Sequence, residues 1–285
     1  MGLVVPPEEV QVSHVPRTVA VGCVAHPEWY SPAEFLTLAR TAEAAGLDDL
    51  WLWEDCFKES GVAAAGAILG VTSRLRVGLG VLPAPLRNVA LTAMEVATLD
   101  GMFPGRLIPG LGHGVQSWME QVGGRVSSPL TLLREQVDAL RALLHGERMT
   151  VAGRYVTLDD VALDWPPSSP PPVLAGGQGP KTLRLVGEVA DGVVLPGGTS
   201  PGDLRRALEL TAEGRALAGR TGPFEVCATV DLPPDVRAKG AQAAADYIRP
   251  WLEAGATRVP VLAGDHDLAA TAWLGEKVAP LLRAV

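Results

Sequence analysis

The sequence predicts an α/β fold in which eight parallel strands alternate with helices and close into one (β/α)8 barrel over residues 1–285. Three observations support this prediction. Short apolar runs alternate with helical patterns along the chain. These runs are apolar nearly throughout, as strands are when helices cover both faces of a parallel sheet. Residues 43–52, 188–195 and 253–262 each repeat a helix end, a small turn and a buried strand. An open, doubly wound sheet is the alternative.

The expected strands follow from the apolar runs. In chain order they span residues 18–25, 47–53, 75–82, 106–112, 172–176, 191–197, 224–230 and 257–264. Their spacing is regular except between the fourth and the fifth, where about sixty residues intervene. This long connection, roughly 113–171, contains a helical stretch, the pattern of a small hairpin around 148–158 and the rigid segment "PPSSPPP". Long insertions of this kind are expected on the active-site face of a barrel.

Several helices are predicted from their first residues. Ser31, Pro32 and Glu34 supply an N-cap, a proline at the first helical position and a capping-box acid, and Gly46 ends that helix before the second strand. The same start recurs further along the chain. It is found at Ser128 with Pro129, at Gly179 with Pro180 and at Ser200 with Pro201.

Composition narrows the classes of function. Hydrophobic residues make up 47% of the chain and charged residues 20%, which indicates a well-buried globular protein. The net charge of -8 gives no general attraction for nucleic acid or for an anionic membrane surface. The apolar stretch 61–71 is too short to span a bilayer, and residues 1–16 contain no continuous apolar segment typical of a secretory signal. Three widely spaced cysteines fit a reducing compartment, so we expect a cytoplasmic protein.

Glycine pairs end the fifth and sixth predicted strands. Residues 176–179 (Gly-Gly-Gln-Gly) precede a helix that starts at Pro180, and residues 197–199 (Gly-Gly-Thr) open the following helix. In a barrel, such loops lie at the carboxyl ends of the strands, where active sites are found. Glycine permits close approach of a ligand, and the free N–H groups of a helix start bind phosphate. The two loops predict a cradle for one phosphate group, although glycine also suits a tight β-to-α turn.

Candidate catalytic residues follow three other strands. His26 comes after the first strand, Glu54 and Asp55 after the second, and His113 lies between two glycines after the fourth. A carboxyl or an imidazole on this rim could deliver a proton to a reacting molecule. Each also has a structural alternative, as a solvated loop residue, a helix cap or a turn residue. No metal-ligand spacing, serine-hydrolase elbow or P-loop occurs, so no metal is expected.

Residues 77–123, the helical stretch "SPLTLLREQVDALRALLHGE" and the stretch "GPKTLRLVGEVADGVVL" resemble the luciferase-like flavin-dependent oxidoreductases. The resemblance covers nearly the whole chain. It is closest to the actinobacterial branch that uses the deazaflavin coenzyme F420 and is related to methylenetetrahydromethanopterin reductase. It implies a (β/α)8 barrel with an insertion after the fourth strand, a coenzyme F420 ring, or alternatively FMN, across the strand ends, a cis peptide at Gly80–Val81 and a homodimer.

The resemblance also implies which residues contact the cofactor. The tail phosphate would be held by Gly176, Gly177, Gln178, Gly179, Gly197, Gly198 and Thr199, and the ring would lie against Trp53, Gly80, Val81, Leu82, Gly112, His113, Gly114 and Pro196. Sugar-phosphate dehydrogenases of this family carry a histidine where this chain has Asp55 and a glutamate where it has Val115. Oxidation of a sugar phosphate is therefore not expected.

The expected reaction is hydride transfer from reduced deazaflavin to an activated C=C or C=N bond of a small organic substrate. His113, Asp55, Glu54 or His26 would supply the proton. An FMN-dependent luciferase-like monooxygenase and a flavin-binding barrel without catalytic activity are the alternatives. The choice of substrate is left open, because pocket-lining residues vary within the family.

Overall fold

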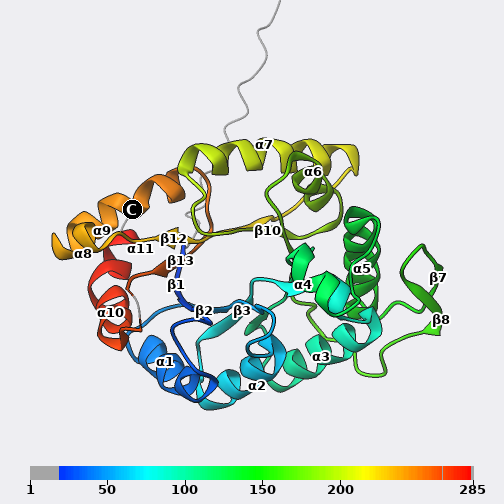
Figure 1. Cartoon of the computed structure of the whole chain (residues 1–285), viewed down its shortest axis with the longest axis horizontal. Coiled ribbons are helices and arrows are strands. Elements are labelled where there is room, and N and C mark those ends of the chain that lie inside the picture. The colour runs from blue at the N-terminus through cyan, green and yellow to red at the C-terminus, as the bar shows by residue number, and fades with distance from the viewer. Residues whose placement is uncertain (1–18, 265, 284–285) are drawn as a thin grey trace, which may run out of the picture.

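A computed structural model describes residues 19–264 and 266–283 (Figure 1). The expectation that no secretory signal is present concerns residues 1–16, which lie outside the described residues. Helices surround the parallel strands on all sides in Figure 1. No helix in the described part of the chain is long and apolar enough to cross a membrane.

Within the described residues, eleven short parallel segments form the central sheet. They are β1 (Ala20–Ala25), β2 (Asp49–Leu52), β3 (Arg76–Leu79), β4 (Leu82–Pro83), β5 (Leu107–Ile108), β6 (Gly110–Gly112), β9 (Leu174–Gly176), β10 (Gly192–Leu195), β11 (Glu225–Ala228), β12 (Val230–Asp231) and β13 (Arg258–Leu262). Because β3 with β4, β5 with β6 and β11 with β12 each continue one strand, the eleven segments make the eight predicted strands.

The sheet closes on itself. β13 pairs with β1, β3 pairs with β5, and β6 pairs with both β4 and β9, so every strand of the ring has two neighbours. β3 and β4 lie on either side of the Gly80–Val81 peptide bond, which is cis as the resemblance implies. β5 and β6 are separated by Pro109, which has no N–H to donate to a neighbouring strand. The closed barrel is confirmed, and the open, doubly wound sheet is wrong.

The helices alternate with the strands and begin where the sequence predicts. They are α1 (Pro32–Ala44), α2 (Gly61–Val71), α3 (Val89–Met102), α4 (Gln116–Gln121), α5 (Pro129–Leu144), α6 (Pro180–Val189), α7 (Pro201–Leu217), α8 (Pro234–Ala238), α9 (Ala241–Glu253), α10 (Leu268–Trp273) and α11 (Ala279–Arg283), with the short turns η1 (Ala84–Leu86) and η2 (Leu274–Val278). Helices α1, α5, α6 and α7 each start at a predicted proline, and α1 and α7 carry full capping boxes.

The connection between β6 and β9 holds α4, α5 and a hairpin of β7 (Met149–Ala152) and β8 (Thr157–Val161). Helix α5 packs between α3 and α6 as one of the outer helices, and the hairpin lies outside it (Figure 1). Glu135 of α5 accepts hydrogen bonds from three backbone amides of the hairpin turn. Of this connection, only residues 113–118 contribute to the cavity at the carboxyl ends of the strands.

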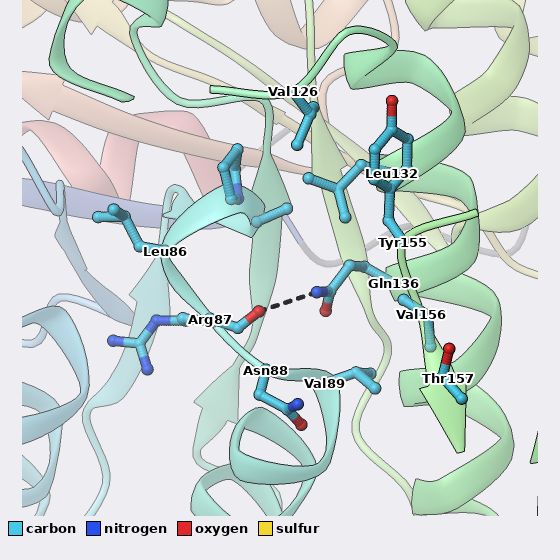
Figure 2. Close-up of a pocket in the computed structure, with 12 residues that line it drawn as sticks. Leu86, Arg87, Asn88, Val89, Val126, Leu132, Gln136, Tyr155, Val156 and Thr157 are labelled. Atoms are coloured by element: carbon cyan, nitrogen blue, oxygen red, sulfur yellow. Dashed lines mark hydrogen bonds between the residues drawn. The ribbon is translucent and has the colours of Figure 1, made fainter. Parts of the chain in front are cut away.

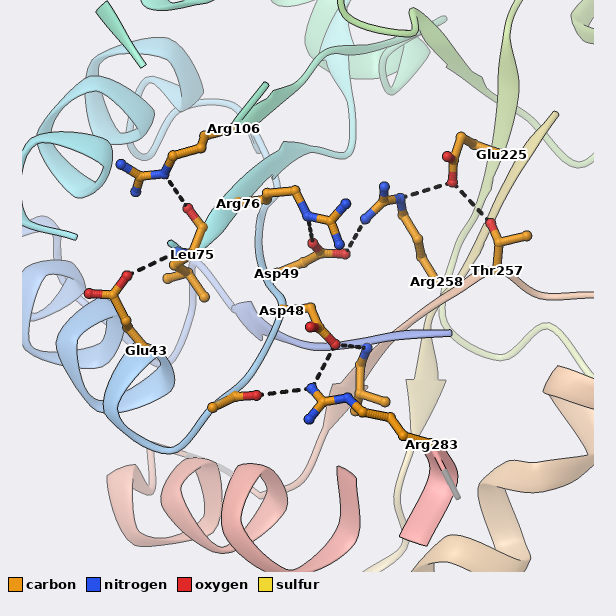
Figure 3. Close-up of polar contacts among 12 residues, drawn as sticks. Glu43, Asp48, Asp49, Leu75, Arg76, Arg106, Glu225, Thr257, Arg258 and Arg283 are labelled. Carbon is orange, nitrogen blue, oxygen red and sulfur yellow. Dashed lines mark hydrogen bonds and ion pairs between the residues drawn. The ribbon is translucent and has the colours of Figure 1, made fainter. Parts of the chain in front are cut away.

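Paired charges fill the opposite end of the barrel, where the strands begin (Figure 3). Asp49 of β2 is only 1% exposed, and its carboxylate lies 2.7 Å from Arg258 and 2.9 Å from Arg76. Arg258 also contacts Glu225 at 3.0 Å. Removing one partner from such a buried cluster typically destabilises a protein by about 3–5 kcal/mol, because a buried charge is left unpaired. These charges, which come from four strands, hold the start of the ring together.

Above this charged layer, the barrel interior is apolar. Trp51, which is 1% exposed, packs with Val24, Leu174, Val194 and Cys227. Its ring occupies the space in which side chains at residues 78 and 80 would stand, so both positions are glycine. The indole therefore forms a floor, and any ligand space must lie on the side where the strands end.

Candidate active site

A cavity of about 420 Å³ opens at the carboxyl ends of the strands, a volume within the usual range for small-molecule sites. Its lining residues are Trp53, Glu54, Asp55, Gly80, Val81, Gly112, His113, Gly114, Val115, Trp118, Gly176, Gly177, Gln178, Val194, Pro196 and Thr229. Most of the predicted site residues are therefore brought together. Six of them do not line this cavity, namely His26, Leu82, Gly179, Gly197, Gly198 and Thr199.

Val81 forms part of the cavity wall, and its side chain explains why residues 112 and 176 are glycine. An added Cβ at Gly112 would collide with a methyl group of Val81, and one at Gly176 would lie 2.8 Å from the other methyl. These glycines thus make room for a side chain of the protein, where the sequence had suggested room for a ligand. Leu82, the next residue, is fully buried in the core behind this wall.

His113 is held by the first turn of α6. Its Nε2 lies 3.1 Å from the hydroxyl of Thr182, and Gly177 has no side chain because the methyl group of Thr182 occupies that position. Nδ1 is buried and makes no hydrogen bond within the described residues. Burial lowers the pKa of His113, and the Pro129 carbonyl counteracts only part of this effect. His113 is therefore a ring in the cavity wall whose Nε2 is engaged by Thr182 and whose pKa lies below its ordinary value of 6.5.

Glu54 is engaged by an arginine and by a helix start. Its Oε1 lies 2.8 Å from Nη2 of Arg87 and accepts a 2.9 Å hydrogen bond from the amide of Gly61, the first residue of α2. Arg87 also pairs with Glu95 at 2.5 Å. Because both of its oxygen atoms face Arg87, Glu54 stabilises the rim and is poorly placed to deliver a proton.

The backbone of Arg87 is fixed from a second direction. Gln136 of α5 donates a 2.9 Å hydrogen bond to its carbonyl (Figure 2). This contact borders a separate cavity of about 400 Å³ on the outer flank of the barrel, between η1, α5 and the hairpin. The guanidinium of Arg87 points away from Gln136 in Figure 2. None of the predicted site residues lines this flank cavity.

Asp55 differs from the other candidates. Its carboxyl lines the active-site cavity, is partly buried and makes no hydrogen bond or ion pair within the described residues. Burial raises its pKa above the ordinary value of 3.8, and the charge of His26 counteracts part of this rise. Among the four residues predicted to supply a proton, Asp55 alone combines a place on the cavity wall with a carboxyl that makes no hydrogen bond or ion pair within the described residues.

His26 belongs to an aromatic cluster beside Asp55. Its ring stacks on Trp29 with centroids 4.3 Å apart and meets the edge of Trp53 at 4.9 Å. The amide of Glu28 donates a 3.2 Å hydrogen bond to Nδ1 of His26. Because Trp53 lines the cavity and His26 does not, the histidine is placed to act through Trp53 and Asp55.

The two glycine loops are not equivalent. The Gly198 amide donates a 2.9 Å hydrogen bond to Asp231, the Thr199 hydroxyl donates to the Pro196 carbonyl, and Asp203 caps α7. The Gly198 amide and the Thr199 hydroxyl of the second loop are thus engaged within the protein, and the carboxylates of Asp231 and Asp203 lie in the same region. In contrast, the Gly179 N-cap of α6 has no side-chain partner, and an added Cβ there would meet nothing within 4 Å. No capping side chain therefore engages the first-turn amides of α6.

A further cavity of about 280 Å³ lies between the starts of α6 and α7. It is lined by Gln178, Pro180, Leu183, Leu195, Gly198, Thr199, Asp203, Arg206, Ala207 and Leu210. Gln178 lines both this space and the active-site cavity. An elongated ligand could therefore extend from one to the other past Gln178.

Sequence reasoning missed three partners that define this site. Thr182, Asp231 and Gln136 each bond to a residue between 33 and 69 positions away in the chain. No local pattern marks such pairs. Across residues 19–264 and 266–283, no three His, Cys, Asp or Glu side chains are placed to hold a metal ion.

Known proteins are similar to this chain over most of its length. The family model for luciferase-like monooxygenases matches residues 13–280. The chain is 31% identical over 243 residues to 5,10-methylenetetrahydromethanopterin reductase of Methanolobus tindarius, which covers 85% of this chain and 74% of the relative. It is 30% identical over 203 residues to F420-dependent glucose-6-phosphate dehydrogenase of Nakamurella multipartita, which covers 65% of this chain and 58% of that relative.

Solved structures show the same fold. An F420-dependent secondary alcohol dehydrogenase in complex with an F420-acetone adduct superimposes with a TM-score of 0.83 at 22% identity, covering 93% of this chain and 99% of the other. The coenzyme F420-dependent tetrahydromethanopterin reductase of Methanopyrus kandleri gives a TM-score of 0.80 at 22% identity, with the same coverage. By its sequence match, and with a barrel that agrees with it, this chain belongs to the luciferase-like monooxygenase family.

Proposed function

We propose that this protein is a coenzyme F420-dependent oxidoreductase that transfers hydride from reduced deazaflavin to an activated C=C or C=N bond of a small organic substrate. The similarity to F420-dependent enzymes supports the cofactor and the reaction class. The observation that carries the choice of proton donor is the Asp55 carboxyl, which faces the cavity and has no hydrogen-bond partner within the described residues. FMN chemistry and binding without turnover are the rival functions.

The residues present fit a deazaflavin. The active-site cavity has an apolar wall at Val81 and Val194 against which a flat ring can pack, and it shares Gln178 with the separate cavity beside the start of α6. Gln178 and the amides of the first turn of α6 would hold the phosphate of the tail. When bound, the cofactor supplies a hydride.

The side chains of the chain then have separate tasks. Asp55, on the cavity wall and with a pKa raised by burial, is the group placed to deliver a proton to the reacting bond. Trp53 and Trp118 contribute large aromatic side chains to the cavity wall, against which a bound molecule can pack. Arg87 fixes Glu54 and thereby the loop that carries Asp55. Thr182 orients the His113 ring. This division of tasks predicts that the four predicted proton donors are not interchangeable.

Titration of the purified protein with coenzyme F420 and with FMN, followed by fluorescence and absorbance, tests the cofactor. We expect F420 to bind and FMN to bind at least about tenfold more weakly. Tighter binding of FMN would overturn the proposal. Oxidation of reduced F420 in the presence of enones and imines then tests catalysis, and no consumption with any of them would favour a binding protein without turnover.

Two variants test the proton donor. Asp55→Asn should lower turnover by about 10²–10⁴-fold while F420 affinity is kept, because the amide cannot supply a proton. Asp235→Asn, on the exposed helix α8, is the matched control and should leave turnover unchanged. Equal turnover of Asp55→Asn and the natural protein would remove Asp55 from this role.

We also infer that the protein forms a homodimer through α2 and α3. Helix α2 contains no charged residue. On α3, Leu91, Met94 and Met102 are 49%, 58% and 63% exposed. Neighbouring exposed apolar side chains of this size are typical of surfaces that a partner covers. A second copy of the chain is the partner that an uncharged face of this kind fits best.

A further inference from the structure

We propose that the flank cavity between η1, α5 and the hairpin is a second ligand site, separate from the active site. Its ligand is a small neutral molecule that has an apolar body and one hydroxyl or N–H donor. The inference follows from preformed walls, from the lack of an available charge and from a buried acceptor without a partner. It does not depend on the proposed hydride transfer.

The walls of the flank cavity are fixed by contacts within the protein. The cavity has a volume of about 400 Å³, which is within the usual range for small-molecule sites. The Tyr155 hydroxyl lies 2.9 Å from that of Ser127 and accepts a 2.9 Å hydrogen bond from the amide of Ser128. Glu135 holds the hairpin turn against α5. A ligand therefore meets walls that are already in place, which lowers the entropy cost of binding.

The wall presents no unpaired charge to a ligand. Arg87 is the only charged residue among the described residues that line the flank cavity. Its guanidinium is shared by Glu54 and Glu95, and it points away from Gln136 in Figure 2. An ion that entered this space would lose hydration without gaining a partner of opposite charge.

The charged neighbours of the lining residues do not change this conclusion. Glu135 and Arg154 adjoin lining residues in the chain, but neither lines the flank cavity. Glu135 accepts three hydrogen bonds from the hairpin turn, and Arg154 donates a 2.7 Å hydrogen bond to Ser127. The ligand that fits this wall is therefore neutral.

Gln136 supplies the polar group that a ligand would recognise. The residue is only 4% exposed, and its Nε2 donates a 2.9 Å hydrogen bond to the carbonyl of Arg87. This bond leaves Oε1 as an acceptor, and Oε1 is buried without a hydrogen bond within the described residues. A buried acceptor without a partner is destabilising, so a ligand that donates an O–H or N–H group to it gains affinity.

Most of the other lining residues are apolar. They include Leu86, Val126, Leu132 and Val156 (Figure 2). These side chains can bury the apolar body of a ligand, and burial of apolar surface favours binding. The ligand class therefore combines one donor with an apolar ring or chain.

Isothermal titration calorimetry with three matched probes tests the ligand class. Indole has an apolar body and one N–H donor, 1-methylindole lacks the donor, and indole-5-carboxylate keeps the donor but adds a negative charge. We expect indole to bind with a Kd on the order of 10⁻⁴ M and the other two to bind about tenfold more weakly. A lack of saturable indole binding would assign the cavity to water and overturn the inference. Equal binding of 1-methylindole or of indole-5-carboxylate would overturn it as well.

Two matched substitutions locate the bound indole. Val126→Phe narrows the flank cavity and should weaken indole binding about tenfold. Val115→Phe narrows the active-site cavity instead and should leave indole binding within about twofold. Neither valine is fully buried, so both variants should fold. Weaker binding in Val115→Phe together with unchanged binding in Val126→Phe would place indole in the active-site cavity and overturn the inference.

Gln136→Met tests the acceptor, because methionine keeps the length of the side chain and removes both polar atoms of the amide. Indole should then bind about tenfold more weakly, as 1-methylindole does, whereas the affinity for 1-methylindole should stay within about twofold. A preference for indole that survives in Gln136→Met would refute the role of Oε1. Thermal unfolding checks that the variant is folded. Should it fail to fold, the three probes on the natural protein and the two valine variants still decide.

Discussion

The hydroxyl of Thr182 lies 3.1 Å from Nε2 of His113 and joins the first turn of α6 to the wall of the active-site cavity. Gly177 makes this contact possible, because any side chain at residue 177 would occupy the position of the Thr182 methyl group. The helix start that we expect to hold the cofactor phosphate is thereby coupled to a ring that faces the cavity. A substitution of Thr182 or of His113 should therefore affect both the start of α6 and the wall of the active-site cavity.

Thr182→Val removes the hydroxyl and keeps the shape of the side chain. The variant leaves Nε2 of His113 without its partner, which should lower the free energy of unfolding by about 1–3 kcal/mol and weaken F420 binding as the ring loses its orientation. Thr182→Ser, which keeps the hydroxyl, is the control and should bind F420 nearly as the natural protein does. Urea unfolding and F420 titration measure the two effects. Unchanged F420 affinity in Thr182→Val would show that this hydrogen bond does not support the site.

Gly177→Ala should lower the stability of the protein, whereas Gly179→Ala should weaken F420 binding and leave stability nearly unchanged. At residue 177 the added methyl group collides with Thr182, so we expect a loss of about 1–3 kcal/mol in the free energy of unfolding. At residue 179 the methyl group meets no atom within 4 Å, so stability should change by less than about 1 kcal/mol while F420 binding weakens. Thermal unfolding and F420 titration of both variants check this. Normal F420 affinity in Gly179→Ala would move the phosphate site away from the start of α6.

The pH dependence of stability should reveal the raised pKa of Asp55. Because burial raises this pKa above 3.8, the folded protein binds the proton more tightly than the unfolded chain does. The resulting stabilisation is complete below pH 3.8 and is lost as the pH rises through the raised pKa. Asp55→Asn lacks this loss, so its stability relative to the natural protein should increase as the pH rises from 3.8 through the raised pKa of Asp55. Urea unfolding at several pH values gives the difference, and a constant difference would contradict the raised pKa.

Met94→Lys should separate the proposed dimer. The side chain is 58% exposed on α3, so a lysine there costs little in a monomer but places two like charges in a symmetric interface. We expect sedimentation to show a dimer for the natural protein and monomers for the variant, with little change in thermal stability. Leu217→Lys, at a residue that is 78% exposed near the end of α7, is the matched control and should remain dimeric. A monomeric natural protein would refute the proposed interface.

Local patterns predicted much of the fold and part of the site. The spacing of apolar residues predicted the eight strands, and capping residues and prolines predicted the starts of α1, α5, α6 and α7. These predictions succeed because strands and helix starts depend on residues that are close together in the chain. The same patterns placed Asp55, His113 and Gln178 after strands, and parallel strands bring such positions to one end of a barrel.

The roles of the glycines depended on distant side chains. The sequence suggested that Gly176 and Gly177 leave space for a ligand, whereas Val81 and Thr182 occupy that space. The repeated loop at residues 197–199 suggested a second set of free amides, but Asp231 accepts the hydrogen bond of one of them. The sequence shows that a residue is glycine but does not show whether a ligand or a side chain of the protein approaches it.

The sequence by itself determined the barrel, the end of it that carries the site and most of the residues that line the cavity there, because strand positions follow from hydrophobic period and from the direction of parallel strands. Only the tertiary structure decided which of those residues are available for chemistry. Arg87 engages Glu54, Thr182 engages His113, and the Asp55 carboxyl makes no hydrogen bond or ion pair within the described residues. The physical reason is that hydrogen bonds and desolvation depend on distances between residues far apart in the chain, and a local sequence pattern contains no such distances.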